Sequence, residues 1–252
     1  MVCLVGPASI RAPKEDTVRA LVIVPAYNEA RSLPTLLPAI REAMPAADIC
    51  VVDDGSDDET AAIAAAHGAV VLRNAVNLGI GGAVQAGYLW ARDHGYEVAV
   101  QVDGDGQHDP RFVPLLLAPI AEGGADLVIG SRFLTAGGFR STALRRAGIR
   151  YLSWFIAMRC GARVSDPTSG LRAAGRRAIE LFARAYPSDY PEPESIPIAI
   201  RAGLRVTEQA TEMAPRRHGR SSIGASQTLY YLMKVSLALI LLPQHPNRRD
   251  AR

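Results

Sequence analysis

The residues best suited to chemistry lie in Val98–Asp109, where an apolar run ends in carboxylates. Such a run is typical of a buried parallel strand that delivers polar groups to the carboxyl edge of a sheet. Alternate side chains of an extended chain share a face, so Asp103, Asp105 and Gln107 are expected to point the same way. Three oxygen ligands form half of the shell of a hard cation, and we expect Mg²⁺ or Mn²⁺, with substrate phosphates and water filling the other positions.

An acidic turn between a strand and a helix is the alternative interpretation of this stretch. Asp109 and Pro110 suit the N-cap and the first helical position in either case. Gly104 and Gly106 would let a ligand approach the backbone closely. The surrounding chain must therefore decide between the two interpretations.

The elements that would position these residues alternate between strand and helix over residues 20–132, which is typical of an α/β, doubly wound, mostly parallel sheet flanked by helices. The strands are expected at Leu21–Val24, Ile49–Val52, Val70–Leu72, Val98–Val102 and Asp126–Ile129. The helices are expected at Ser32–Met44, Thr60–His67 and Asn77–Asp93, and after Pro110.

Polar groups follow all five predicted strands, and ligands of such sheets bind outside the carboxyl ends of the strands. These groups are Tyr27 and Glu29, Asp53 and Asp54, Asn77 and Gly79, Asp103 to Gln107, and Arg132. The glycines of Gly79–Gly82 follow the third strand and do not fit a dinucleotide fingerprint. We interpret them as a helix start that packs close to a nucleotide.

The second half of the chain is less regular, and Leu204–Glu208 is expected to be a strand. Ala143–Arg159 has the pattern of an amphipathic helix, while three other segments are expected to be loops: Asp166–Arg172, Tyr190–Glu194 and Arg216–Ser222. With 252 residues, the chain suits one α/β domain. We divide it into a mobile arm (1–19), a single domain (20–227, with a nucleotide-binding half 20–132 and an acceptor half 133–227), an apolar helix (228–242) and a polar tail (243–252).

Charge is distributed unevenly along the chain. Residues 1–125 carry 8 Lys and Arg against 16 Asp and Glu, whereas residues 126–252 carry 20 against 9. The acidic half suits a metal, and the basic half suits phosphates or an anionic membrane surface. Solvated helix faces remain the alternative for any single arginine.

Three widely spaced cysteines predict a reducing compartment without a disulfide framework. We expect no signal peptide and no spanning helix, because the amino terminus lacks a basic start and no apolar run reaches about 20 residues. Thr228–Leu242 would be about 22 Å long as a helix and contains Lys234. It is expected to lie on the inner face of the membrane or on a membrane protein, unless it is a core helix that closes the domain.

Five pieces in this order resemble the inverting glycosyltransferases of family 2, in the group that contains dolichol-phosphate mannose synthase and other polyprenyl-phosphate glycosyltransferases. The pieces are Val24–Glu29, Val52–Ser56, Asp103–His108, Gly130–Arg132 and Asp166–Arg172. The resemblance covers roughly Leu21 to Leu242. It implies an A-type glycosyltransferase fold, a nucleoside-diphosphate sugar as donor and a polyprenyl phosphate as acceptor.

The resemblance also implies residue roles. Asp103, Asp105 and Gln107 would bind the metal and the diphosphate, and Arg132 would reach the diphosphate or the acceptor phosphate. A loop that begins at Arg216 matches one that closes over the donor phosphates in the family. The base and ribose would be held by Pro25, Tyr27, Glu29 and Asp53, with Asp54 as a less certain member.

Two departures from the family pattern are present. Ile80 stands where many relatives carry a lysine, so a phosphate contact from that position is missing. The dolichol-phosphate synthases often end in transmembrane helices, which this sequence does not show.

The nature of the acceptor decides whether a base is needed. A lipid phosphate is already anionic near neutral pH, whereas a sugar hydroxyl must lose its proton to a carboxylate. Glu194, Glu192 and Asp166 are the candidates, and a turn or cap residue is the alternative for each. We expect Asp105, Arg132, Arg216 and Glu194 to carry the catalysis.

Other functions remain to be weighed. A glycosyltransferase that acts on a polysaccharide or soluble acceptor is the nearest alternative. A nucleotidyltransferase would place a basic, glycine-rich loop after the first strand, and Pro25–Glu29 contains no Lys or Arg. A non-catalytic nucleotide-sugar sensor or membrane scaffold is disfavoured by the intact Asp103–Asp105 pair. Nucleic-acid binding is not expected, since no known module is present.

Overall fold

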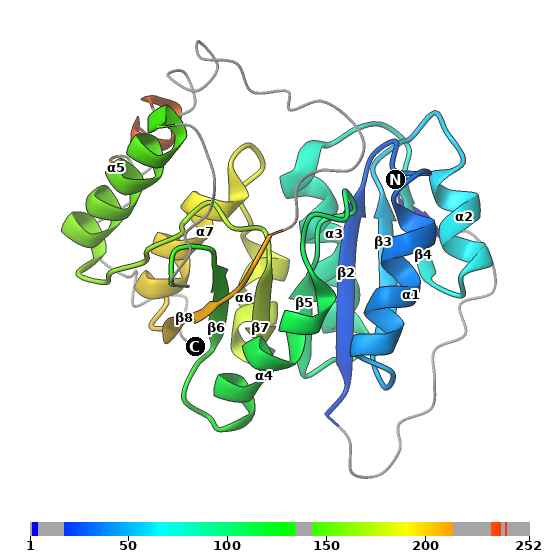
Figure 1. The fold of residues 1–252 in the computed structure, drawn as a ribbon, viewed down its shortest axis with the longest axis horizontal. Coiled ribbons are helices and arrows are strands. Elements are labelled where there is room, and N and C mark those ends of the chain that lie inside the picture. The colour runs from blue at the N-terminus through cyan, green and yellow to red at the C-terminus, as the bar shows by residue number, and fades with distance from the viewer. Residues whose placement is uncertain (1, 5–17, 135–142, 214–232, 238–239, 241–252) are drawn as a thin grey trace.

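The chain folds around one mixed sheet whose two faces are covered by helices (Figure 1). The computed structural model describes residues 2–4, 18–134, 143–213, 233–237 and 240. The strands are β1 (Val2–Leu4), β2 (Ala20–Ala26), β3 (Asp48–Asp53), β4 (Val70–Asn74), β5 (Val98–Gln101), β6 (Leu127–Ser131), β7 (Arg172–Gly175) and β8 (Val206–Ala210). The helices are α1 (Leu33–Ala43), α2 (Thr60–Ala66), α3 (Gly79–Asp93), the short 3-10 helix η1 (Pro110–Phe112), α4 (Val113–Ala121), α5 (Ala143–Cys160), α6 (Arg176–Arg184) and α7 (Pro191–Arg201).

The strand order is β1-β4-β3-β2-β5-β7-β6-β8. β2 pairs in parallel with β3 and β5, β3 with β4, and β6 with β8, whereas β7 runs antiparallel between β5 and β6. Parallel pairing brings the carboxyl ends of β2, β3, β4 and β5 to one edge, where the polar residues lie.

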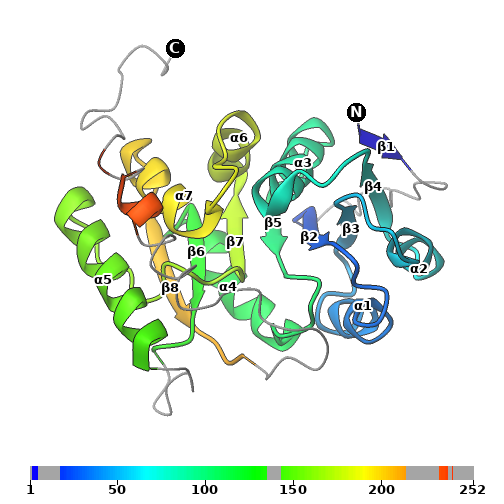
Figure 2. The same ribbon diagram turned by 90° about the horizontal axis from the view of Figure 1, so that it is seen from above.

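Apolar side chains on both faces of the strands explain the three-layer arrangement (Figure 2). All seven residues of β2 are buried, and those of Ala20–Val24 alternate between two clusters. One cluster joins the sheet to α1, α2 and α4, and the other joins it to α3 and α6. A third, smaller cluster packs α5 against α7, and Val235 is buried within it.

The predicted α/β sheet is confirmed, and every predicted strand and helix in residues 20–132 is present with its ends shifted by a few residues. Asp109 is the expected N-cap, and its carboxylate accepts a hydrogen bond from the backbone N–H of Arg111. Ser32 stands at the N-cap of α1 without a capping bond from its side chain, whose hydroxyl donates to Glu29 instead.

Three differences from the expectation concern segments that carry weak or misleading signals. Val2–Leu4, expected in an arm without regular structure, pairs with β4 as an antiparallel strand. β7 and α6 were not anticipated, because Arg172–Gly175 is too short to show an alternation. Tyr190–Glu194 was expected to be a loop, yet α7 begins at Pro191, since a helix tolerates proline in its first turn.

The apolar segment Thr228–Leu242 lies mostly outside the described residues. Residues 233–237 are helical, and Lys234 Nζ lies 2.6 Å from a carboxylate oxygen of Asp189. No helix in the described part of the chain has the length and apolar character needed to cross a membrane.

We predict that Asp126→Asn lowers the free energy of unfolding by about 2 kcal/mol. The buried Asp126 carboxylate accepts hydrogen bonds from the backbone N–H and side chain of Arg205 and from the Arg177 side chain. The pKa of Asp126 is lowered to about 2, and the side-chain hydrogen bonds from Arg205 are the largest cause. Its stabilising contribution is therefore present above the pKa of the unfolded chain, near 4, and is lost as the pH falls toward 2.

Urea unfolding at pH 7 and at successively lower pH measures this effect. The difference between the wild type and Asp126→Asn should shrink as the pH falls from 5 toward 2. An equal difference at all pH values would contradict the assigned role of this carboxylate.

Candidate functional site

The acidic loop after β5 lies against the carboxyl end of β2. Val102 N–H donates to the Ile23 carbonyl at 3.0 Å, and Gly104 N–H donates to the Pro25 carbonyl at 3.1 Å. A Cβ atom at position 104 would lie 2.8 Å from that Pro25 oxygen, so only glycine allows the two backbones to approach this closely. The chain thereby fixes Asp103 and Asp105 beside the segment that carries Tyr27.

The carboxylates of the acidic loop are held in defined positions. Asp103, whose side chain is 30% exposed, accepts a hydrogen bond from Gln101 Nε2 at 3.2 Å. His108 Nδ1 lies 3.6 Å from the other Asp103 oxygen. Asp105 accepts a bond from the Gln107 backbone N–H at 3.0 Å.

The donor set of this loop fits a hard divalent cation that shares its shell with a diphosphate. Among the described residues, no three His, Cys, Asp or Glu side chains converge as a complete metal site. Two carboxylates and an amide oxygen, with positions left for phosphate and water, are what Mg²⁺ or Mn²⁺ accepts. Asp103, Asp105 and Gln107 would hold the ion.

A second loop, residues 165–171 between α5 and β7, presses on this acidic loop. A Cβ atom at position 170 would lie 2.8 Å from the carboxyl carbon of Asp103, and 2.7 Å from Oδ1. The backbone of Gly170 therefore forms one wall around the Asp103 carboxylate. The segment Asp166–Arg172, expected to be a turn-rich loop, is thus brought directly to the predicted metal site.

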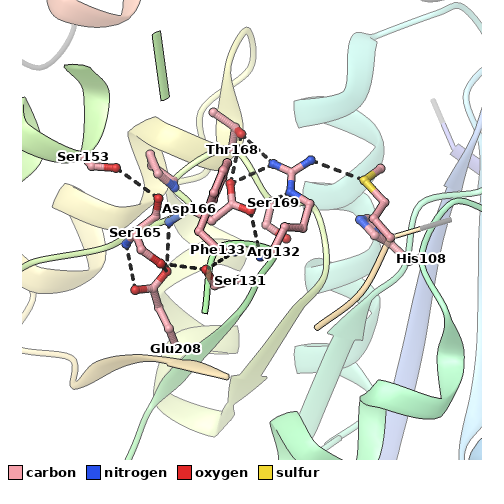
Figure 3. Close-up of polar contacts among 12 residues, drawn as sticks. His108, Ser131, Arg132, Phe133, Ser153, Ser165, Asp166, Thr168, Ser169 and Glu208 are labelled. Atoms are coloured by element: carbon pink, nitrogen blue, oxygen red, sulfur yellow. Dashed lines mark hydrogen bonds and ion pairs between the residues drawn. The ribbon is translucent and has the colours of Figure 1, made fainter. Parts of the chain in front are cut away.

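A buried ion pair anchors the first half of the 165–171 loop (Figure 3). Arg132 Nε donates to Asp166 Oδ2 at 2.6 Å, and Nη2 donates to Oδ1 at 2.7 Å. Both side chains are almost fully buried. Further donations go from Arg132 Nη2 to Thr168 Oγ1 and from Nη1 to the Met213 sulfur. Arg132, expected to reach a phosphate, thus holds the loop that borders the metal site.

Arg172 anchors the second half of the same loop. Its guanidinium, 1% exposed, donates to the carbonyls of Ser169, Pro167 and Glu192 and to the Ser195 hydroxyl. Arg172 ends the motif Asp166–Arg172, but the motif alone predicts no role for it. The sequence signal that could have revealed its role is an arginine directly before the apolar residues of a strand, where its side chain is expected to be buried and hydrogen-bonded.

Two glutamates of α7 differ in their surroundings. Burial, opposed by Arg172 and reinforced by the nearby Asp103 carboxylate, raises the pKa of Glu192 to about 7. Burial and Asp189 raise the pKa of Glu194, while Lys234 lowers it. Glu192 therefore belongs to the acidic site, whereas Glu194, the expected catalytic residue, has the Asp189–Lys234 pair as its electrostatic neighbours.

The expected nucleotide-binding residues gather at the carboxyl ends of β2 and β3. Tyr27 is 46% exposed and available to a ligand. Glu29 is bound to the α2 start, since its N–H donates to Thr60 Oγ1 at 2.9 Å. Asp53 is fully buried, accepts a bond from Ser56 N–H and pairs with Arg73.

Asp54, Asn77 and Gly79 meet at the start of α3. The Asp54 carboxylate accepts hydrogen bonds from the backbone N–H groups of Leu78 and Gly79 and from Asn74 Nδ2. Asn77 Oδ1 also accepts from the Gly79 N–H at 2.9 Å. Both Asp54 oxygens thus stabilise the helix start, and nucleotide contacts by these three residues stay predictions.

Arg216 lies outside the described residues, so its predicted role over the donor phosphates also stays a prediction.

Comparisons with known proteins agree with this geometry. The sequence pattern described as Glycosyl transferase family 2 matches residues 21–180. An undecaprenyl-phosphate mannosyltransferase of Micrococcus luteus is 35% identical over 215 residues, which cover 82% of this chain and 88% of that protein. A polyprenol monophosphomannose synthase of Mycolicibacterium smegmatis is 32% identical over 240 residues, covering 91% and 89%.

Solved structures support the fold alone. Glucosyl-3-phosphoglycerate synthase of Mycobacterium tuberculosis, in a complex with Mn²⁺, UDP-glucose and phosphoglyceric acid, superposes with a TM-score of 0.69 at 23% identity. The match covers 89% of this chain and 80% of that one. The predicted A-type glycosyltransferase fold is thereby confirmed.

We predict that Gly170→Ala weakens Mn²⁺ binding about tenfold, because the added methyl group must displace the Asp103 carboxylate. Gly124→Ala is the matched control, since its Cβ would meet only the Pro119 carbonyl at 3.5 Å. Electron paramagnetic resonance titration of free Mn²⁺ measures both variants. Equal affinities would show that position 170 does not constrain Asp103.

Proposed function

The chain belongs to glycosyltransferase family 2, and from this premise we propose that it transfers a sugar from a nucleoside-diphosphate sugar to a polyprenyl phosphate, with inversion and with a divalent metal ion. The observation that carries the proposal is the contact of the 165–171 loop with Asp103, which joins the donor half to the acceptor half. The two mannosyltransferase relatives, named for undecaprenyl phosphate and for polyprenol monophosphomannose, support the acceptor class.

The chemistry requires stabilisation of a departing nucleoside diphosphate. A bound Mg²⁺ or Mn²⁺ would supply positive charge to the diphosphate as the sugar bond breaks. Asp103 and Asp105 would hold that ion, and Tyr27 would lie beside the base. The complex of the fold neighbour with Mn²⁺ and UDP-glucose supports this type of donor site.

When a lipid phosphate receives the sugar, no general base is needed, and residues 133–227 would serve to position that phosphate. Such a phosphate is anionic near pH 7 and attacks the sugar directly. Arg132, expected to contact a phosphate, would instead shape the acceptor site by fixing Asp166 and Thr168. The loop that begins at Arg216 remains the proposed source of direct phosphate contacts.

Transfer to a sugar hydroxyl is the second candidate function, and one observation favours it. Glu192, a partly buried carboxyl group, interacts with Gln101 and Asp103. A carboxylate in that position could accept the proton of a hydroxyl nucleophile. Incubation with nucleotide sugars, Mn²⁺ and either polyprenyl phosphate or soluble glycans, with product identification by mass spectrometry, separates the two functions.

We also propose that the enzyme works as a peripheral protein on the inner face of the membrane, and that α5 forms the contact. Trp154 and Met158 on α5 are 58% and 56% exposed, and Met233, Leu237 and Ile240 are exposed to a similar degree. The two segments touch, since Tyr151 Oη and Ser236 Oγ lie 2.9 Å apart. Arginines on exposed positions of α5 add positive charge suited to anionic lipid: Arg145, Arg146 and Arg150.

We predict that Asp105→Ala lowers the rate of transfer at least 100-fold, because the metal loses one of its carboxylates. The fold should persist, since Asp105 lies in a loop outside the core. The release of nucleoside diphosphate, measured with and without chelator, tests the loss, and circular dichroism tests the fold. Full activity of the variant in excess chelator would refute the metal-dependent mechanism.

We predict that replacing Trp154 and Met158 together by serine reduces flotation with anionic vesicles of phosphatidylglycerol at least fivefold, because Trp and Met would no longer enter the interface. Leu115→Ser on α4 is the control, since Leu115 is 51% exposed and α4 packs in the first core cluster, whereas α5 packs in the third. Equal flotation of all three proteins, or no flotation of the wild type, would contradict the proposed surface.

A further inference from the structure

The 165–171 loop depends on a carboxylate that no sequence motif includes. Glu208 stands on β8, the edge strand, opposite Ile129 of β6. Its Oε2 accepts a hydrogen bond from Ser165 N–H at 2.7 Å. Its Oε1 accepts one from Ser165 Oγ at 2.9 Å and another from Asp166 N–H at 3.0 Å. One side chain thus binds three donors at the start of the loop (Figure 3).

The three donors are on Ser165 and Asp166, at the start of the loop whose other end borders the acidic site. The Ser165 hydroxyl also lies 2.7 Å from Ser131 Oγ, next to Arg132. Asp166 carries the carboxylate that pairs with Arg132. Four residues further along the chain, Gly170 touches the Asp103 carboxylate.

We infer that Glu208 is a positioning residue for sugar transfer, which fixes the 165–171 loop and, through Gly170, the orientation of Asp103 toward the metal and diphosphate. This inference rests on the proposed function, because it assigns to Asp103 the role of a metal ligand. Glu208 itself contacts neither the metal nor the substrate in this scheme. It acts through the two backbone N–H groups that it binds.

The charge of Glu208 matters because backbone N–H groups in an irregular loop must find partners. A carboxylate offers acceptors on both oxygens, and a hydrogen bond to a charged group contributes about 1.5–3 kcal/mol. Glutamine has a similar shape but offers one acceptor oxygen, so its NH₂ group must face at least one of the three donors. Glu208→Gln should therefore loosen the loop while keeping the side-chain volume.

Glu212 provides the matched control. It lies four residues further along the same segment and is exposed, and no hydrogen bond or ion pair joins it to the 165–171 loop in the described part of the chain. Glu212→Gln removes the same charge from the same edge of the sheet. Any effect of net charge alone should appear in both variants.

The experiment uses the full-length protein and three measurements. Hydrogen exchange followed by mass spectrometry, on the protein without added metal, measures the exchange rate of backbone amides in peptides that contain residues 163–170. Titration of Mn²⁺ with UDP or GDP, followed by electron paramagnetic resonance, gives the metal affinity. Steady-state kinetics separates kcat from the KM of the donor.

For Glu208→Gln we expect about tenfold faster exchange in the loop, about tenfold weaker Mn²⁺ binding and about tenfold lower kcat. Glu212→Gln should match the wild type in all three. Glu208→Asp, which keeps the charge on a shorter side chain, should recover part of the Mn²⁺ affinity. Such a recovery distinguishes positioning of the metal ligand from a general loss of stability.

Two results would overturn the inference. Unchanged Mn²⁺ affinity and kcat in Glu208→Gln, despite faster loop exchange, would show that the loop does not position Asp103. Equal losses in Glu208→Gln and Glu212→Gln would assign the effect to net charge. Failure of the wild type to bind Mn²⁺ with either nucleotide would instead refute the metal-dependent function, with the loop-exchange measurement still testing the Glu208 anchor.

Discussion

The arrangement of the site depends on the ion pair between Arg132 and Asp166, because both charges are removed from water. Burying one charge without a partner costs several kcal/mol, so neither side chain is tolerated there alone. The pair is stable because its remaining hydrogen-bonding groups are also used, by Thr168, Met213 and the Arg132 backbone N–H. This requirement ties the end of β6 to a loop 34 residues further along the chain.

Because of the antiparallel strand β7, the loop that this ion pair holds lies next to the acidic loop. β7 inserts between β5 and β6, so the segment that precedes it must cross the carboxyl end of β5, where Asp103 lies. Arg172, the first residue of β7, opposes Gln101 in the register. Its guanidinium holds the carbonyls of the crossing segment, and the absence of a side chain at Gly170 leaves room for the Asp103 carboxylate. A wholly parallel sheet would not bring these two loops together.

The first half of the molecule could be predicted from the sequence because its signals are local. Apolar runs mark the strands, and the residues that follow them, such as Asp103 and Asp53, must lie at one edge once the strands are parallel. The second half could not be predicted in the same way. Glu208 binds Ser165 from 43 residues away, and Glu192 is tied to the site by the hydrogen bond that Arg172 of β7 donates to its carbonyl. Prolines 191 and 193 also resemble loop residues, although they occupy the first turn of a helix.

The α5 helix connects the outer surface of the molecule to these internal contacts. Its Ser153 hydroxyl lies 3.2 Å from the Ser165 carbonyl, which places α5 against the same residue that Glu208 binds. Trp154, the next residue, projects outward with 58% of its surface exposed. A helix that exposes apolar side chains on one face and contacts the site loop on the other can bring a lipid-bound acceptor to the acidic site without the acceptor leaving the interface. Under the proposed function with a polyprenyl phosphate as acceptor, the exposed apolar face follows from the substrate, since the polyprenyl chain would otherwise have to be transferred into water at about 0.8 kcal/mol for each CH₂ group.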